Sequence, residues 1–288
     1  MRLFHASIMI ASLLSPGVFA ASVPRAIYTD PLPDKKFPAT MTVLHIPTSG
    51  VAINGIAYLP TGPGPHPVLL ICHGLPGNEK NLDLAQAARR AGWVAVTFNY
   101  RGSWGSPGVF SFSGNLEDAS AALAYLRDPQ TAASLRLDPK RIAIAGHSMG
   151  GWVTATTAAR DPALLGAVLI SAADFSRIAT MPHDQIAALM ADNMEALAGV
   201  TADSMATEIE AHKANYSLVD DAVGLKNTPL LVLSSDDGLA PHTDALVAAI
   251  RAKGGTRVIT KHVATDHGWS DHRIELESTV IRWLQTLN

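Results

Sequence analysis

The chain has 288 residues, of which 48% are hydrophobic, and its 22 basic and 25 acidic residues leave a formal net charge of −3. The sequence has neither the basic stripe that is typical of a nucleic-acid-binding protein nor the cationic amphipathic helix that is typical of a protein bound to anionic membranes. The one cysteine, Cys72, excludes an intramolecular disulfide. A chain of this length can bury a core large enough to fold without such a bridge.

The first 20 residues have the pattern of a signal peptide. Arg2 supplies the positive start, residues 6–14 are apolar, and Val18-Phe19-Ala20 meets the small-residue rule at a cleavage site. The apolar run is far shorter than the roughly 20 residues that span a bilayer. We therefore expect cleavage after Ala20 and a periplasmic or secreted protein without stable membrane insertion.

The rest of the chain predicts an N-terminal arm at residues 21–40 and one α/β domain at residues 41–288. The arm is rich in proline and lacks periodicity, and the domain opens with a hairpin. Strand and helix patterns then alternate, which predicts a mostly parallel sheet with helices on both faces. The expected strands are 41–46, 51–59, 68–72, 94–98, 142–145, 167–171, 229–234 and 257–263, and the expected helices include 80–91, 116–127 and 152–160.

Alternation stops at about residues 174–226, where no strand pattern occurs and a small helical insertion is predicted. Met205 and Ile209 fall on one helix of this insertion. A second apolar face is formed by Ile186, Leu189, Met190, Met194 and Leu197. Two interpretations stay open: an adaptable, methionine-rich apolar lid over a pocket, or ordinary packing of a helical insertion.

The most informative motif is Gly146-His147-Ser148-Met149-Gly150, which has the form G-x-S-x-G. A short apolar strand pattern precedes it and an alanine-rich helix pattern follows it. This context is typical of a nucleophile elbow, in which a sharp turn lifts the serine hydroxyl above the edge of the sheet. The helix that follows aims its N-terminal N–H groups at developing negative charge.

With this motif the chain resembles the α/β-hydrolase superfamily of serine hydrolases, from about Thr40 to the C-terminus. Further motifs that carry the resemblance are residues 73–77 (HGLPG), 236–241 (DDGLAP) and 266–268 (DHG). The dienelactone-hydrolase-like and prolyl-oligopeptidase-like branches look closest, because of the 73–77 loop and of residues 100–105 (YRGSWG). The resemblance implies an eight-stranded sheet and a helical cap.

In such folds the catalytic residues follow in the order serine, acid, histidine. The acid is expected just after the strand at residues 229–234, at Asp237, with Asp236 as the alternative; Asp237 could instead only cap the next helix. His267 follows the last strand and is expected to be the base. The oxyanion hole is expected to use the backbone N–H groups of Met149 and Leu75.

Several neighbouring residues have structural interpretations. His73 is expected to order its loop by hydrogen bonding, and Arg101 is expected to pair with Glu117 or Asp118. Cys72 ends an apolar strand, which predicts an inert buried thiol. No spacing typical of metal ligands or of cofactor binding occurs, so we expect no metal and no cofactor.

The sequence thus predicts an exported enzyme that cleaves carboxylic esters through an acyl-Ser148 intermediate, acting on a small-molecule ester or amide. Three alternatives stay open. The chain could be a peptidase or acylaminoacyl hydrolase of the prolyl-oligopeptidase-like branch, or it could transfer acyl groups to an alcohol. It could also be a non-enzymatic binding protein on an inactive hydrolase scaffold.

Overall fold

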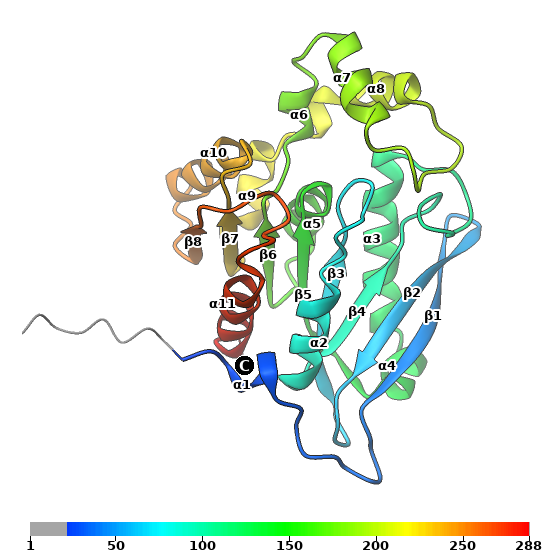
Figure 1. Ribbon diagram of the computed structural model, residues 1–288, viewed down its shortest axis with the longest axis vertical. Helices are drawn as coiled ribbons and strands as arrows, with labels where there is room; N and C mark the ends of the chain where they lie inside the picture. Colours follow the sequence, from blue (N-terminus) through cyan, green and yellow to red (C-terminus); the bar gives the residue numbers. More distant parts are fainter. Residues whose placement is uncertain (1–21, 288) are drawn as a thin grey trace, which may run out of the picture.

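The computed structural model describes residues 22–287 and contains one eight-stranded sheet (Figure 1). The expected signal peptide at residues 1–20 lies outside the described residues. The strand order is β1-β2-β4-β3-β5-β6-β7-β8, antiparallel at β1–β2 and β2–β4 and parallel elsewhere. The strands are β1 (Thr40–Thr48), β2 (Val51–Leu59), β3 (His66–Cys72), β4 (Val94–Phe98), β5 (Leu137–His147), β6 (Gly166–Ile170), β7 (Leu230–Ser234) and β8 (Val258–His262).

Helices cover both faces of this sheet, which confirms the predicted fold class. They are α1 (Arg25–Tyr28), α2 (Leu82–Arg90), α3 (Phe112–Arg127), α4 (Pro129–Ser134), α5 (Met149–Arg160), α6 (Phe175–Ile178), α7 (His183–Ala191), α8 (Ala202–Ala211), α9 (Ala222–Leu225), α10 (Ala240–Ala252) and α11 (Arg273–Gln285), with short 3₁₀ turns at Lys213–Asn215 and Val219–Asp221. In β3, Leu69 and Ile71 pack in the core beneath α2 and α11, whereas Val68 and Leu70 pack in the core beneath α3 and α5. Side chains alternate across a strand, so both faces of β3 are apolar.

The parallel strands fix the place of the candidate site. β3, β5, β7 and β8 run in the same direction, so the loops that follow them meet at one edge of the sheet. Each of these loops carries one part of the residue set expected from the sequence. Ligand sites in open α/β sheets lie at this carboxyl edge.

Residues 174–226, which we call the cap, hold α6 to α9 and the two 3₁₀ turns. In Figure 1, α6, α7 and α8 lie above the carboxyl ends of the strands. One expectation about the cap is wrong: α7 ends at Ala191, so Met194 and Leu197 do not share its apolar face. Leu197 instead forms an isolated bridge with Ser103, a tertiary contact that the helical spacing could not reveal.

The segment before the sheet is more ordered than its lack of periodicity suggested. It contains α1, and β1 begins at Thr40, within the range expected for the arm. Arg90 of α2 donates hydrogen bonds to the carbonyls of Ala26 and Ile27. These contacts hold α1 against α2.

Candidate active site

Ser148 lies at the sharp turn between β5 and α5. Its φ of 58° and ψ of −119° place a non-glycine residue in the left-handed half of backbone space, a conformation that costs about 1–3 kcal/mol. The neighbouring glycines allow this turn, because a Cβ on Gly146 would lie 2.0 Å from the carbonyl oxygen of Gly150. A Cβ on Gly150 would in turn lie 2.1 Å from the carbonyl oxygen of Cys72.

His267, on the loop after β8, faces a buried carboxylate. Its Nδ1 lies 2.7 Å from Oδ2 of Asp237, whose side chain is only 4% exposed. The other oxygen, Oδ1, accepts a hydrogen bond from the N–H of Leu239 at 2.9 Å. Burial favours the neutral acid, but the hydrogen bonds from His267 and Leu239 outweigh it and hold the pKa of Asp237 well below its usual range.

This geometry distinguishes the two candidate acids. Asp236 is exposed and pairs with Nε2 of His262 at 2.9 Å. The structure therefore brings Asp237, rather than Asp236, to His267. Because the carboxylate accepts a hydrogen bond from Nδ1–H, the proton of the neutral imidazole stays on Nδ1. The lone pair of Nε2 is then available to take a proton from another group.

His147 is a supporting residue that the sequence did not reveal. Its Nε2–H donates to the carbonyl of His267 at 2.7 Å, and the two rings lie 4.5 Å apart. Burial lowers the pKa of His147 to about 4, so this imidazole is neutral at physiological pH. The signal lay in the motif itself, because the residue before Ser148 shares its turn and its surroundings.

The loop after β3, residues 73–78, approaches Ser148 closely, and we call it the β3 loop. A Cβ on Gly74 would lie 3.1 Å from Cβ of Ser148. Burial lowers the pKa of His73 to about 4, and its neutral ring donates Nδ1–H to the carbonyl of Gly74 at 2.7 Å. That carbonyl belongs to the same peptide group as the N–H of Leu75, so His73 helps to orient this donor.

Met149 is the second residue expected to form the oxyanion hole. It is the first residue of α5, and the first N–H groups of a helix have no intrahelical partner. Met149 and Leu75 line the same cavity as Ser148. Both residues expected to form the oxyanion hole thus line a cavity that Ser148 also lines.

Ser148 and His267 line two cavities at the carboxyl edge of the sheet. The first, of about 300 Å³, lies under the cap and is lined by Leu75, Ser148, Met149, Ala173, Phe175, Ile178, Leu189, Met190, Asn193, Asp237, Leu239 and His267. The second, of about 190 Å³, lies along the β3 loop and is lined by residues 74–79, 147, 148, 267 and 268. No lysine or arginine is among the described residues that line either cavity.

The cap methionines do not form one continuous lining. Met190 lines the first cavity, Met205 is buried, and Met181 is 36% exposed. Apolar cap contacts with the cavity also come from Phe175, Ile178 and Leu189. The cap therefore contributes both ordinary core packing and an apolar wall beside Ser148.

Other predicted structural roles agree with the geometry. Arg101 pairs with both expected acids, Glu117 at 2.6 Å and Asp118 at 2.7 Å. Cys72 is buried, and burial raises its pKa to about 12, so the thiol stays protonated.

Within residues 22–287, no group of three or more His, Cys, Asp or Glu side chains is placed to hold a metal ion. No helix in that range is long and apolar enough to cross a membrane.

Comparison with known families gives a match at residues 74–271 to the alpha/beta hydrolase fold family. The chain belongs to this family. The matched residues include the β3 loop from Gly74 onward, the turn at Ser148, the cap and the loop that carries His267. The family assignment therefore rests on the part of the chain that forms the candidate site.

The chain is also similar to individual curated proteins. An uncharacterized protein of Mycobacterium tuberculosis is 30% identical over 54% of this chain and 57% of its own length. The quorum-quenching protein AidA of Acinetobacter baumannii is 32% identical over 45% of this chain and 42% of its own length. The chain thus spans about half the length of these curated relatives.

A solved structure extends the likeness over most of the α/β-hydrolase domain. The thermostable carboxylesterase EstE1, cloned from a metagenomic library, superposes with a TM-score of 0.64 at 23% identity. The superposition covers 89% of this chain and 91% of the esterase. At this identity the likeness establishes the shared fold.

Proposed function

We propose that this α/β-hydrolase is a serine hydrolase that cleaves carboxylic esters through an acyl-Ser148 intermediate. The observation that carries the proposal is the 2.7 Å contact between His267 and the buried Asp237, beside a cavity that also exposes Ser148. A serine becomes a nucleophile when a neighbouring base takes its proton. The imidazole of His267 is that base, and Asp237 fixes its tautomer.

The reaction proceeds in two halves. Oγ of Ser148 attacks the ester carbonyl carbon as Nε2 of His267 takes the hydroxyl proton, and Asp237 stabilises the imidazolium that forms. The tetrahedral oxyanion accepts hydrogen bonds from the N–H groups of Leu75 and Met149. His267 then gives its proton to the leaving alcohol, and water, activated by the same imidazole, releases the acid and restores Ser148.

The cavity under the cap favours a neutral, apolar acyl group. Its cap-side lining is apolar apart from the Asn193 amide, and Asp237 adds negative charge. Burial of a carboxylate there would lack a cationic partner and would be costly. The substrate class is therefore a small ester with an uncharged acyl portion.

A substrate panel tests this function. The mature protein should hydrolyse p-nitrophenyl esters of neutral acids, and Ser148→Ala should lose that activity while keeping the fold. Faster cleavage of aminoacyl anilides than of esters would favour the peptidase alternative. Preferential transfer to an added alcohol would favour the acyltransferase alternative, and no turnover of any substrate would favour a binding protein.

We also propose that the protein is exported and that its signal peptide is removed. The proposal rests on the sequence pattern of residues 1–20. Mass spectrometry of the protein from periplasm or medium should give Ala21 or Ser22 as the first residue. Membrane-bound protein that retains Met1 would contradict cleavage.

A further inference from the structure

Trp104, on the loop that follows β4, contacts two other loops at once. Its indole Nε1–H donates to the carbonyl of Pro76 at 2.7 Å. Its backbone N–H donates to the carbonyl of Ala196 at 3.0 Å. Pro76 belongs to the β3 loop and Ala196 to the cap, so one residue joins the cap to the loop that approaches Ser148.

The conformation of Trp104 is held by several interactions. Its φ of 49° lies in the left-handed region, which is unfavourable for a bulky residue. Nζ of Lys80 lies 4.2 Å from the centre of the indole ring, a favourable cation–π distance. Asn99 accepts a hydrogen bond from Lys80 at 2.9 Å and donates one to the carbonyl of Trp104 at 3.2 Å. These contacts offset the backbone strain and fix the indole over the β3 loop.

The cap segment that contacts Trp104 is itself tied down. The N–H of Ala198 donates to the carbonyl of Gly102 at 2.8 Å, and its carbonyl accepts from the N–H of Phe110 at 3.1 Å. A second link joins the cap directly to the β3 loop, because Asn78 donates to Oε1 of Glu195 at 2.8 Å. The cap therefore reaches the β3 loop by two routes.

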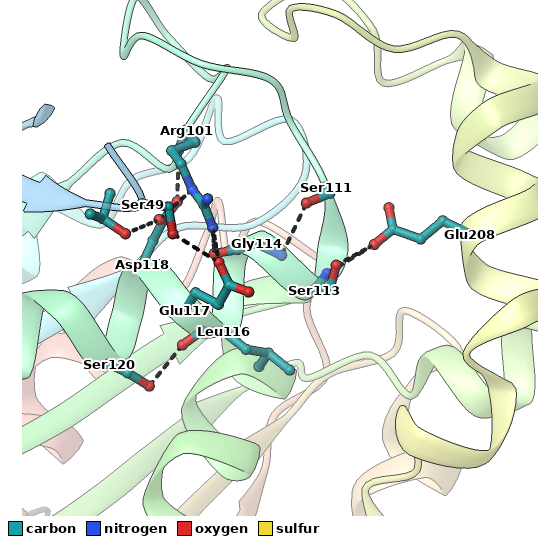
Figure 2. A network of polar contacts seen from close by, with 11 residues as sticks. Ser49, Arg101, Ser111, Ser113, Gly114, Leu116, Glu117, Asp118, Ser120 and Glu208 are labelled. Carbon is teal, nitrogen blue, oxygen red and sulfur yellow. Dashed lines mark hydrogen bonds and ion pairs between the residues drawn. The ribbon is translucent and has the colours of Figure 1, made fainter. Parts of the chain in front are cut away.

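Both the cap and the loop after β4, residues 99–111, are fixed to α3, as Figure 2 shows. Arg101, at the start of the loop, pairs with Asp118 at 2.7 Å and donates to the carbonyl of Gly114 at 3.0 Å. From the cap, Glu208 accepts hydrogen bonds from the N–H and the hydroxyl of Ser113 at 2.9 and 3.0 Å. These attachments give Trp104 and Ala196 a common support.

These contacts matter because of the residue that lies between them. The N–H of Leu75 shares its peptide group with the carbonyl of Gly74, which is held by His73, and it lies two peptide groups before the carbonyl of Pro76, which is held by Trp104. An oxyanion donor acts only when it lies about 2.7–3.1 Å from the developing charge. A displacement of about 1 Å can cost on the order of 10² in rate.

We propose that Trp104 is a positioning residue that holds the Leu75 N–H in the oxyanion hole and links its position to that of the cap. This inference rests on the proposed function. Trp104 does not line either cavity beside Ser148, so it acts through Pro76. Its loss should weaken binding of the transition state more than binding of the ester.

Trp104→Phe tests this role, because phenylalanine keeps an aromatic ring near Lys80 but removes the indole donor. kcat should fall about 10- to 100-fold while KM changes by less than about twofold. The rate of Ser148 phosphonylation by a fluorophosphonate should fall by a similar factor, since that reaction also places a charged oxygen in the hole. Unchanged kcat and unchanged phosphonylation in the folded variant would overturn the proposal.

Trp283→Phe is the control for general damage by a Trp-to-Phe change, because Trp283 is buried in the core beneath α2 and α11 and lines neither cavity beside Ser148, whereas Trp104 is 37% exposed. It should reduce stability without changing kcat; an equal loss of kcat in both variants would mean general damage and would overturn the proposal. Absence of Ser148-dependent turnover in the wild-type protein would instead defeat the proposed function itself.

The second link, between Asn78 and Glu195, gives an independent test that leaves Trp104 unchanged. Glu195→Ala removes the contact with Asn78, whereas Glu195→Gln keeps an acceptor for it. Glu195→Ala should lower kcat by about two- to tenfold at constant KM, and Glu195→Gln should restore most of it. If Trp104→Phe does not fold, this pair decides: wild-type kcat in Glu195→Ala overturns the link between cap and Leu75.

Discussion

The Asp237 carboxylate lies 2.7 Å from Nδ1 of His267, while Asp236, one residue earlier, faces His262. The two acids therefore provide a matched pair for mutation. Asp237→Asn should lower kcat by about 10⁴, because an amide no longer fixes the tautomer or stabilises the imidazolium. Asp236→Asn should leave kcat within about threefold of wild type, as expected for an exposed ion pair. The reverse order in ester-hydrolysis kinetics would move the acid to Asp236.

The sequence predicted most of the fold because its strands are short apolar runs at regular spacing. It also predicted the turn at Ser148, because Gly146 and Gly150 flank the serine and a strand pattern precedes the motif while a helix pattern follows it. The choice between Asp236 and Asp237 depends on which carboxylate turns inward. A shift of one residue reverses that direction, and the register of the motif was ambiguous at Ser234.

The contacts of Trp104 could not be predicted for a different reason. They join residues 76, 104 and 196, which are far apart in the chain and come together only when β3, β4 and the cap are packed. The role of His147 is similar, because its partner His267 lies 120 residues later. Local patterns specify elements and turns, whereas such hydrogen bonds depend on tertiary packing.

Activity should rise with pH along an acid limb that follows one proton. His73 and His147 have pKa values of about 4, because burial disfavours their cations, and Asp237 stays ionised because its pKa is lowered. The proposed base, His267, must be neutral to accept the Ser148 proton, so acid conditions should lower the activity. The measurement is kcat/KM for a neutral ester between about pH 4.5 and 9.

Histidine variants test which side chain carries this dependence. His262→Ala should keep the midpoint of the wild-type profile of kcat/KM against pH, because His262 pairs with Asp236 and not with the proposed catalytic residues. A His267→Ala variant with substantial turnover and the same limb would show that another group is the base.

Esters with a negatively charged acyl group should be poor substrates. No lysine or arginine is among the described residues that line the cavity under the cap, so a succinyl ester should show kcat/KM at least about 100-fold below that of a butyryl ester. Leu189→Arg should narrow this ratio about tenfold, because Leu189 lines the cavity and is 39% exposed. Leu82→Arg is the matched control, since Leu82 is similarly exposed on α2. A ratio unaffected by Leu189→Arg would place the acyl group elsewhere.

The backbone strain at Ser148 should be measurable as stability. Ser148→Gly relieves the unfavourable φ of 58°, whereas Ser148→Ala removes the same hydroxyl and keeps the strain. Glycine also loses more chain entropy than alanine on folding, which costs about 0.5–1 kcal/mol. The net effect should make Ser148→Gly about 1 kcal/mol more stable than Ser148→Ala in urea unfolding. Equal stabilities would limit the strain to about the entropy cost of glycine, and a Ser148→Gly variant less stable than Ser148→Ala by that full cost would mean that the turn is not strained.

The most direct test of the central claim is covalent labelling of the mature protein with a fluorophosphonate, read by intact mass and peptide mapping. The account predicts one adduct per chain, located on Ser148, with loss of ester hydrolysis in proportion to labelling. Ser148→Ala should show no adduct and should lose about 10⁶ in kcat. Labelling at another residue, or turnover by Ser148→Ala above about 10⁻³ of wild type, would contradict Ser148 as the nucleophile.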